Sequence, residues 1–318
     1  MILILSSEDD LHVQRVVSHL PLGTYQVLNL RTMGVVSFLE FDPVNGSSTI
    51  SFLNNSQAFS LSDITSIWYR RPRYKRGSEG GEEWKRVFAE NEERCVFDGM
   101  WRYLGDTVRW LNNPFANRMA ENKLWQLYIA KEIGFELPQT LVTNNPDSLR
   151  RFANENGDIV YKPVAKSHIE RPNDAPLIFL TKPIKKFELD KLVSRVSVTP
   201  CLFQKYIEKQ FEIRVTILGD QVFAVAQYSQ ENMETRHDWR RDPTKVRHEK
   251  VELPTEIQQR CIALVRKMGL TFGAIDIIFT PDERFIFLEI NPNGQWLWIE
   301  DLVAHPISHA IATMLQGA

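Results

Sequence analysis

Strand and helix signals alternate along the first third of the chain. The opening run MILIL has the continuous apolar character of a strand that is buried on both faces. Apolar residues then recur with helical spacing at Leu11, Val16, Val17 and Leu20, and YQVLNL and ITSIWYR indicate two further strands. Strand, helix and strand in this order predict a βαβ unit and a parallel sheet.

The remainder of the chain has the same mixed pattern. A glycine-rich, charged stretch, RYKRGSEGGEEW, predicts an exposed loop, and residues 84 to about 110 predict a long helix. Further helices are expected at KLWQLYIAKEIG, 185–195, 255–268 and from near His305, with strands at LPQTLVT, DIVYKP and CLFQKYI. The fold class is therefore α/β (α+β), in three parts that span residues 1–114, 115–200 and 201–318.

Two stretches near the carboxyl end predict antiparallel hairpins. FEIRVTIL and QVFAVAQY are joined by Gly-Asp, and FGAIDIIFT and FIFLEIN are joined by PDER. Strand side chains alternate between faces, so the first hairpin separates two sets, which are Ile213, Val215 and Ile217 on one face and Glu212, Arg214 and Thr216 on the other. A loop centred on Asp282 and Glu283 places Asp276 directly opposite Glu289, with Asn291 on the same face.

Two carboxylates that face each other on neighbouring strands repel. At about 5 Å and an effective dielectric constant near 20, the repulsion between Asp276 and Glu289 is roughly 3 kcal/mol. A shared proton, a nearby Lys or Arg, or a divalent cation would offset it, and two carboxylates with the amide oxygen of Asn291 suit Mg²⁺. A register slip that exposes one carboxylate to solvent is the alternative.

Composition and charge narrow the class of protein. The 318 residues are 43% apolar with a net charge of -2, which argues against binding nucleic acid through bulk charge. Three cysteines in no metal-like spacing favour a reducing compartment. The apolar start is too short for a signal peptide, and no apolar run approaches the roughly 18 residues of a membrane span. We therefore expect a soluble, cytoplasmic protein.

Several cationic residues stand where a phosphate would need them. Lys162 ends a buried-looking strand, and Lys123 begins a helix, where its charge opposes the helix dipole unless an anion is near. Arg214 can reach phosphate if its face of the hairpin lines a cleft, and Arg240 lies in the polar loop ETRHDWRRDP. Taken alone, each of the two lysines fits an ordinary surface position better, the face of Arg214 would normally lie in solvent, and a solvated basic loop accounts for Arg240 equally well. No GxxxxGK[ST], HExxH or Gly-x-Ser-x-Gly motif occurs.

In order along the chain, these motifs resemble those of the ATP-grasp superfamily. The motifs are Lys123, YKP with Lys162, LFQKYI, EIR, AIDIIF and FLEINPNGQW. WYRRP at 68–72 and NPNGQW draw the resemblance toward the RimK-related macrocyclases of microviridin-type peptides, the graspetide synthetases. The resemblance is strongest over residues 115–300. Two departures are a stretch without glycine after Lys162, VAKSHIERPNDAP, and Lys205 where an acidic hinge residue is common.

The resemblance implies a three-domain ATP-grasp architecture and a role for each site residue. Lys123 and Lys162 would bind ATP phosphates, and Arg214 and Arg240 would act catalytically by steadying the transferred phosphate. The remaining roles would be adenine binding by Gln204, Lys205, Tyr206 and Ile207, ribose binding by Glu212, and Mg²⁺ binding by Asp276, Glu289 and Asn291.

The resemblance also implies a reaction and partners. Glu or Asp side chains of a ribosomal precursor peptide would be activated as acyl phosphates and closed into ω-ester or ω-amide rings. The leader segment of that peptide would be bound, and the enzyme would be a homodimer that uses neither nucleic acid nor membrane. Two alternatives stay open: a RimK-type ligase that joins an amino acid to a small molecule or protein terminus, and a non-catalytic, nucleotide-dependent peptide-binding protein.

Overall fold

The computed structural model describes residues 1–32, 37–52, 58–72, 82–165, 168–171, 174–178, 181 and 183–317. The chain divides into two compact units, Met1–Ala116 with Pro306–Ala318, and Asn117–His305. The three-part division at residues 114 and 200 remains a prediction. Most of the expected glycine-rich loop RYKRGSEGGEEW, residues 73–81, lies outside the described residues.

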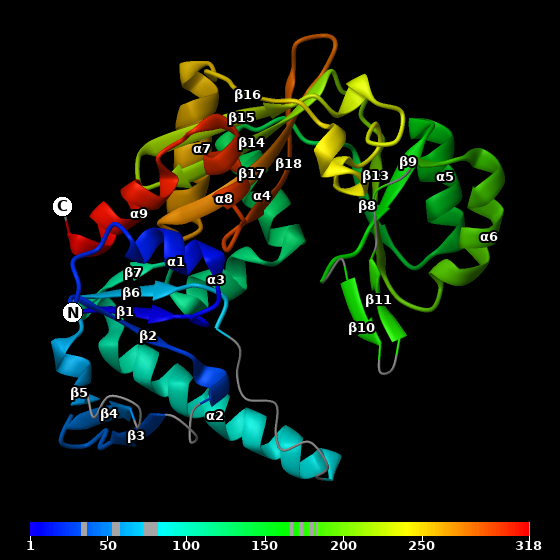
Figure 1. Cartoon of the computed structure of the whole chain (residues 1–318). Helices are drawn as coiled ribbons and strands as arrows, with labels where there is room; N and C mark the ends of the chain where they lie inside the picture. Colours follow the sequence, from blue (N-terminus) through cyan, green and yellow to red (C-terminus); the bar gives the residue numbers. More distant parts are fainter. Residues whose placement is uncertain are drawn as a thin grey trace. The chain divides into compact units, whose positions relative to one another are not determined.

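A parallel sheet forms the centre of the first unit (Figure 1). Its strands, in the order β2-β1-β6-β7, are Tyr25–Leu28, Ile2–Leu5, Ser66–Tyr69 and Arg109–Leu111. A smaller antiparallel sheet, which the sequence analysis did not predict, comprises β3 (Ser37–Phe41), β4 (Ser48–Phe52) and β5 (Ala58–Phe59). The helices of this unit are α1 (Leu11–Val17), α2 (Glu83–Leu104) and α9 (Ile307–Gln316). The predicted parallel sheet is confirmed.

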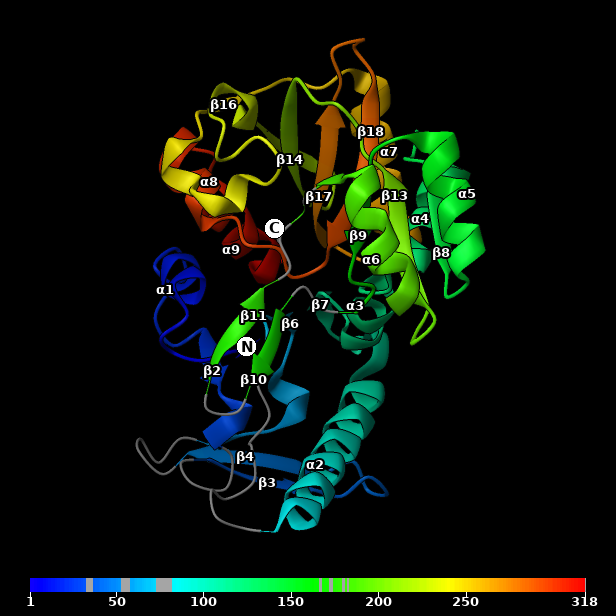
Figure 2. The same ribbon diagram turned by 90° about the vertical axis from the view of Figure 1, so that its right-hand side faces the viewer.

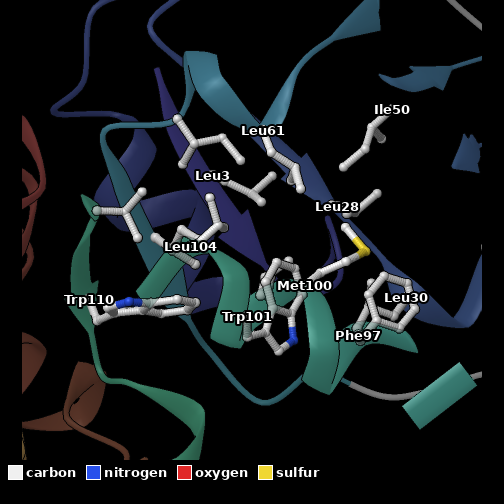
Figure 3. Close-up of a cluster of buried hydrophobic side chains, with 14 residues drawn as sticks. Leu3, Leu28, Leu30, Ile50, Leu61, Phe97, Met100, Trp101, Leu104 and Trp110 are labelled. Carbon is white, nitrogen blue, oxygen red and sulfur yellow. The ribbon is translucent and has the colours of Figure 1, made fainter. Parts of the chain in front are cut away.

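The core of the first unit lies between the parallel sheet and the last turns of α2 (Figure 3). Leu3 and Leu5 from β1 pack with Phe97, Met100 and Trp101 from α2. The aromatic rings of Phe97 and Trp101 stack with their centroids 5.7 Å apart. This packing fixes the carboxyl-terminal half of a helix whose first turns are exposed.

Two predictions in this unit are wrong in detail. The long helix ends at Leu104 rather than near residue 110, because Gly105 takes a φ of 47° that breaks the helix, and the apolar residues after it form β7. Leu11 does not face the core: it is 64% exposed, whereas Val13 is 2% exposed.

The second unit contains a four-stranded antiparallel sheet whose helices lie along one side of it (Figure 1). Its strands, in the order β12-β9-β13-β8, are Pro183–Ile184, Ile159–Lys162, Cys201–Lys205 and Thr140–Thr143. Helices α5 (Pro146–Asn156) and α6 (Lys186–Val196) pack against it through Leu149, Leu189 and Val193. A separate strand pair is β10 (His168–Arg171) with β11 (Asp174–Ile178).

A five-stranded antiparallel sheet in the same unit carries most of the candidate site (Figure 2). Its strands, in the order β16-β15-β14-β17-β18, are His248–Lys250, Gln221–Gln227, Phe211–Leu218, Phe272–Phe279 and Phe285–Asn291. The helices of this region are α3 (Pro114–Ala120, which leads into this unit), α4 (Lys123–Ile133), α7 (Thr255–Lys267) and α8 (Leu297–Val303). The first predicted hairpin is confirmed, with Leu218 opposite Gln221 and Gly219 at a φ of 58° in the turn.

The second hairpin has the predicted facing pair but not the predicted register near its turn. The loop contains three residues, Pro281 to Glu283, because Thr280 pairs with Arg284. Asp276 nevertheless lies opposite Glu289, since a β-bulge leaves Leu288 without a partner residue and shifts the register by one. The longer loop and the bulge cancel each other at this pair.

Candidate active site

Both faces of β14 are covered, so the polar face does not lie in open solvent. Ile213, Val215 and Ile217 are at most 1% exposed on one face. On the other face, Thr216 is fully buried and the Arg214 side chain is 11% exposed. A strand with polar side chains on a covered face is typical of a site rather than of a solvated edge.

The carboxylates of Asp276 and Glu289 each have a cationic partner. Nη1 of Arg214 lies 3.1 Å from Oδ1 of Asp276, its neighbour across β14 and β17. Nζ of Lys123, at the first turn of α4, donates to Oε2 of Glu289. The sequence analysis gave a shared proton, a nearby Lys or Arg, or a divalent cation as ways to offset the repulsion. The structure shows a lysine beside one carboxylate and an arginine beside the other.

The surroundings of the two carboxyl groups shift their pKa values in opposite directions. Burial raises the pKa of Asp276, Arg214 lowers it, and the negative charge of Glu289 raises it further, so the net shift is upward. Burial also raises the pKa of Glu289, but Lys123 and Lys162 outweigh that effect and hold it well below its usual value. The pair thus forms a centre of two neighbouring carboxyl groups whose pKa values are shifted apart, as is common at functional sites.

The donor set suits a hard divalent cation. Asp276, Glu289 and Asn291 supply carboxylate and amide oxygens from adjacent strands, with Asn291 opposite Ala274. Each ionised carboxylate keeps acceptor sites beyond those that Lys123 and Arg214 use. No group of three or more His, Cys, Asp or Glu side chains is placed to bind a metal within the described residues, so such a site would depend on Asn291.

Lys162 belongs electrostatically to the same centre. Burial at the end of β9 lowers its pKa, while the negative charges of Glu289 and Asp276 raise it. Lys123 and Arg240 also act on Lys162, both lowering its pKa. The structure therefore gathers the cationic residues that the sequence analysis singled out separately.

The segment predicted to bind adenine, residues 204–207, begins at the end of β13 in the four-stranded sheet and continues into the loop that follows. Gln204 is 2% exposed and donates through Nε2 to Oγ1 of Thr140, at 3.1 Å. Its Oε1 is buried and has no hydrogen-bond partner among the described residues. The hydroxyl of Tyr206 lies 3.1 Å from Nδ1 of His237, Lys205 is exposed, and Ile207 is half-buried.

Glu212 is already hydrogen-bonded on both carboxylate oxygens. Lys209 donates to Oε1 and the hydroxyl of Ser229 donates to Oε2. Its side chain is 13% exposed and that of Lys209 is 6% exposed. A ribose role for Glu212 therefore requires its remaining acceptor sites or a change of partner.

Arg240 is oriented by a residue that the sequence analysis did not select. Asp238 accepts from Nε of Arg240 at 2.8 Å and from Nη2 at 2.6 Å, a bidentate pair. The same carboxylate accepts from the backbone N–H of Thr181 at 2.9 Å, and its side chain is 3% exposed. Asp276 and Glu289 act electrostatically on Arg240 as well.

Gln126 is the second residue that the sequence analysis missed. Its amide is buried and bonds to the backbone of Ile290, next to Glu289. A polar residue on the inner face of KLWQLYIAKEIG was the available signal, but glutamine in a helix is too common to mark a site by itself.

Comparison with known proteins gives the family. The model for the prokaryotic glutathione synthetase ATP-grasp domain matches residues 123–291. A glutathione synthetase of Nostoc sp. is 25% identical over 171 residues, which are 53% of this chain and 50% of that protein. The chain thus aligns with about half of the length of this curated relative.

Two solved structures are similar over nearly the whole chain. Macrocyclase MdnC from Microcystis aeruginosa MRC, bound with precursor peptide MdnA, is 28% identical with a TM-score of 0.85, covering 100% of this chain and 99% of that one. A RiPP-associated ATP-grasp ligase from Chryseobacterium gregarium, in complex with ADP and a leader and core peptide, is 28% identical with a TM-score of 0.87, covering 99% and 96%.

These comparisons confirm the resemblance drawn from the motifs between Lys123 and Asn291. The family model covers more than half of the chain and spans every strand that carries a candidate ligand. The chain therefore belongs to the prokaryotic glutathione synthetase ATP-grasp family and is an ATP-grasp ligase, an enzyme class that uses ATP together with Mg²⁺.

Proposed function

We propose that the chain is a peptide macrocyclase that activates Glu or Asp side chains of a ribosomal precursor peptide. The peptide carboxylate attacks the γ-phosphate of ATP, which yields an acyl phosphate and ADP. A Ser or Thr hydroxyl or a Lys amine of the same peptide then attacks the acyl carbon and releases phosphate, closing an ω-ester or ω-amide ring. The observation that carries the proposal is the facing pair Asp276 and Glu289 with its cationic partners Lys123 and Arg214.

In this proposal, Asp276, Glu289 and Asn291 hold Mg²⁺. The raised pKa of Asp276 supports this assignment, because a half-buried carboxyl group that resists ionisation gains from added positive charge. When bound, the cation neutralises charge on the ATP phosphates. Lys123 and Lys162 bind these phosphates, and Lys123 then exchanges its contact with Glu289 for one with phosphate.

The protein side chains act by positioning and by neutralising charge. Arg214 and Arg240 stabilise the phosphoryl group in transfer, and Asp238 holds the guanidinium of Arg240 in place. Oε1 of Gln204, which has no hydrogen-bond partner within the described residues, accepts from the adenine amino group, beside backbone groups of Lys205 to Ile207. Glu212 binds the ribose through its free acceptor sites.

The peptide substrate is supported by similarity along the whole chain. MdnC and the Chryseobacterium ligase align with residues of both units, and each was solved with its peptide. We infer a microviridin-type precursor whose leader segment binds the enzyme. The Nostoc glutathione synthetase supports a second candidate, a RimK-like ligase for free amino acids, but its alignment is limited to 53% of the chain.

We also propose a cytoplasmic homodimer. The three cysteines Cys95, Cys201 and Cys261 are all free, which suits a reducing compartment. None of the helices in the described part of the chain has the length and apolar character that a membrane crossing needs. The exposed apolar side chains of α2, Trp84, Val87, Phe88 and Val96, favour cover by a second copy.

The test is the intact mass of a candidate precursor peptide after incubation with the protein, ATP and Mg²⁺. We expect the loss of one water per ring, and no loss with Asp276→Asn or Glu289→Gln. An unchanged peptide mass together with ATP turnover that a free amino acid stimulates would replace the macrocyclase with the RimK-like ligase. No turnover with a verified partner peptide would leave the non-catalytic, nucleotide-dependent binding protein.

A further inference from the structure

The side-chain amide of Gln126 is buried and makes hydrogen bonds through both of its polar atoms. Nε2 donates to the carbonyl of Ala120 at 2.6 Å and to the carbonyl of Ile290 at 2.8 Å. Oε1 accepts from the backbone N–H of Ile290 at 3.2 Å. Gln126 is 3% exposed, so these bonds replace contacts that its amide would otherwise make with water.

The strand that Gln126 holds is the last strand of its sheet. Among the strands that the structure describes, β18 pairs with β17 on one side alone, so the backbone groups on its outer side need other partners. Glu136 supplies one set, with its carbonyl accepting from the N–H of Phe287 at 3.0 Å. Gln126 supplies the other set at Ile290, where its amide takes the place of a neighbouring strand.

These two anchors stand on either side of the β-bulge at Leu288. Beyond the bulge, Glu289 faces Asp276, whereas before it Phe287 faces Ile277. Because side chains alternate along a strand, a slip of one residue beyond the bulge would turn Glu289 and Asn291 to the opposite face. The bulged register therefore has to be fixed on its far side, and Ile290 is the residue between Glu289 and Asn291.

We infer that Gln126 is a positioning residue that fixes the bulged register of β18 and so holds Glu289 and Asn291 toward the phosphate-binding side. Lys123 lies three residues before Gln126, on the same side of α4. One helical turn thus holds the backbone at Ile290 and places the ammonium group that pairs with Glu289. The inference rests on the proposed function for its consequence in metal binding, but not for the strand register itself.

The test compares Gln126→Met with the wild type in the full-length protein. Methionine keeps the size of the side chain but cannot make the three hydrogen bonds. We expect the amide of Ile290 to exchange with deuterium at least about tenfold faster, and the amide of Phe287, held by Glu136, to keep its rate. Loss of a group that orients metal-ligating residues typically weakens metal binding about 10- to 100-fold. We therefore expect ADP binding in the presence of Mg²⁺ to weaken about tenfold.

Two further variants serve as controls. Gln258→Met removes a glutamine on α7 whose side-chain amide donates to the carbonyl of Leu253 at 2.7 Å, and it should leave both readouts unchanged. Gln126→Glu keeps an acceptor for the N–H of Ile290 but loses both donations, so it should speed Ile290 exchange less than Gln126→Met. It provides the same comparison if the methionine variant fails to fold, as judged by circular dichroism.

Unchanged Ile290 exchange in both Gln126 variants would overturn the inference, as would fast exchange with unchanged Mg²⁺-dependent ADP binding. The variant Glu289→Gln distinguishes failure of this inference from failure of the proposed metal-binding role of Glu289. If Glu289→Gln binds ADP and Mg²⁺ as the wild type does, the metal assignment is wrong, and Ile290 exchange still decides whether Gln126 holds the strand.

Discussion

At the scale of single residues, the candidate site depends on side chains that hold other side chains in place. Asp238 holds the guanidinium of Arg240 through two bonds and is itself tied to the backbone of Thr181. A buried carboxylate in this position restricts an arginine that would otherwise sample many rotamers. The geometry of Arg240 is therefore set before any substrate is bound.

This arrangement predicts the effect of Asp238→Asn. Asparagine keeps an oxygen for the N–H of Thr181 but loses the charge that orients Arg240. We expect peptide-dependent ATP turnover to fall between about tenfold and 100-fold, because small misplacements of a catalytic group have effects of that size. Steady-state ADP release measures this. Asp242→Asn, which changes a carboxylate that pairs with Lys245, is the matched control, and equal rates in both variants would contradict the account.

Asp10 has a comparable role in the first unit. Its Oδ1 caps α1 at the N–H of His12, 2.9 Å away, and its Oδ2 lies 3.4 Å from Nε of the buried Arg70. Burial raises the pKa of Asp10, but His12 and Arg70 more than compensate and lower it below its usual range. Because the folded-state pKa lies below the unfolded value near 4, this charge contributes stability that is fully present above pH 4 and is lost progressively as pH falls from there toward the folded-state pKa.

Asp10→Asn isolates this charge, because asparagine caps helices as well as aspartate does. We expect it to lower the free energy of unfolding by about 1–3 kcal/mol at neutral pH, since a buried guanidinium loses a charged partner. The difference from the wild type should narrow below about pH 4. Urea unfolding at several pH values measures both effects, and a difference that stays constant down to pH 3 would exclude the charge of Asp10 as its cause.

At the scale of elements, the hairpin of β17 and β18 combines a three-residue loop with a bulge. Glu283 in the loop has a φ of 59°, in the left-handed region where a Cβ atom is unfavourable. Glu283→Gly should therefore raise the free energy of unfolding by about 1 kcal/mol, as measured by chemical denaturation. Glu283→Ala keeps the Cβ atom and should give no gain; an equal gain in both variants would point to the glutamate side chain instead.

The same hairpin shows which features could be predicted from the sequence and which could not. Alternation and turn residues identified both strands and the pair of Asp276 and Glu289. The loop length and the bulge at Leu288 were not predictable, because no residue type in PDER or FIFLEIN signals either feature. Gln126 was missed for a different reason: its partner Ile290 is 164 residues away, so only the folded chain brings them together.

At the scale of the whole molecule, the exposed first turns of α2 are the surface that we expect to form the interface of a dimer. Residues 82–89 are exposed along the first turns of this helix, and an isolated helix of that kind is marginally stable in water. We expect the protein to sediment as a dimer and Phe88→Glu to sediment as a monomer with unchanged circular dichroism. Leu22→Glu, at a separate side chain that is 92% exposed, is the control. A wild-type monomer, or a Phe88→Glu dimer, would contradict this prediction.

The order of motifs along the chain predicted the family, and the family model matches the same segment, residues 123–291. It did not predict the small sheet of β3 to β5 or the role of Asp238, since neither has a distinctive local pattern. Carboxylate activation is the chemistry that we propose for the site as a whole rather than for any one residue.

Carboxylate activation is tested most directly by tracing a labelled oxygen atom from the peptide carboxyl group into the products. A precursor peptide whose Glu and Asp carboxyl groups carry ¹⁸O is incubated with the protein, ATP and Mg²⁺, and the released phosphate is analysed by mass spectrometry. We expect one ¹⁸O atom in inorganic phosphate for each ring formed, because the phosphate that leaves the acyl phosphate carries one oxygen of the peptide carboxyl group. Ring formation with unlabelled phosphate, or with ¹⁸O in AMP, would contradict it.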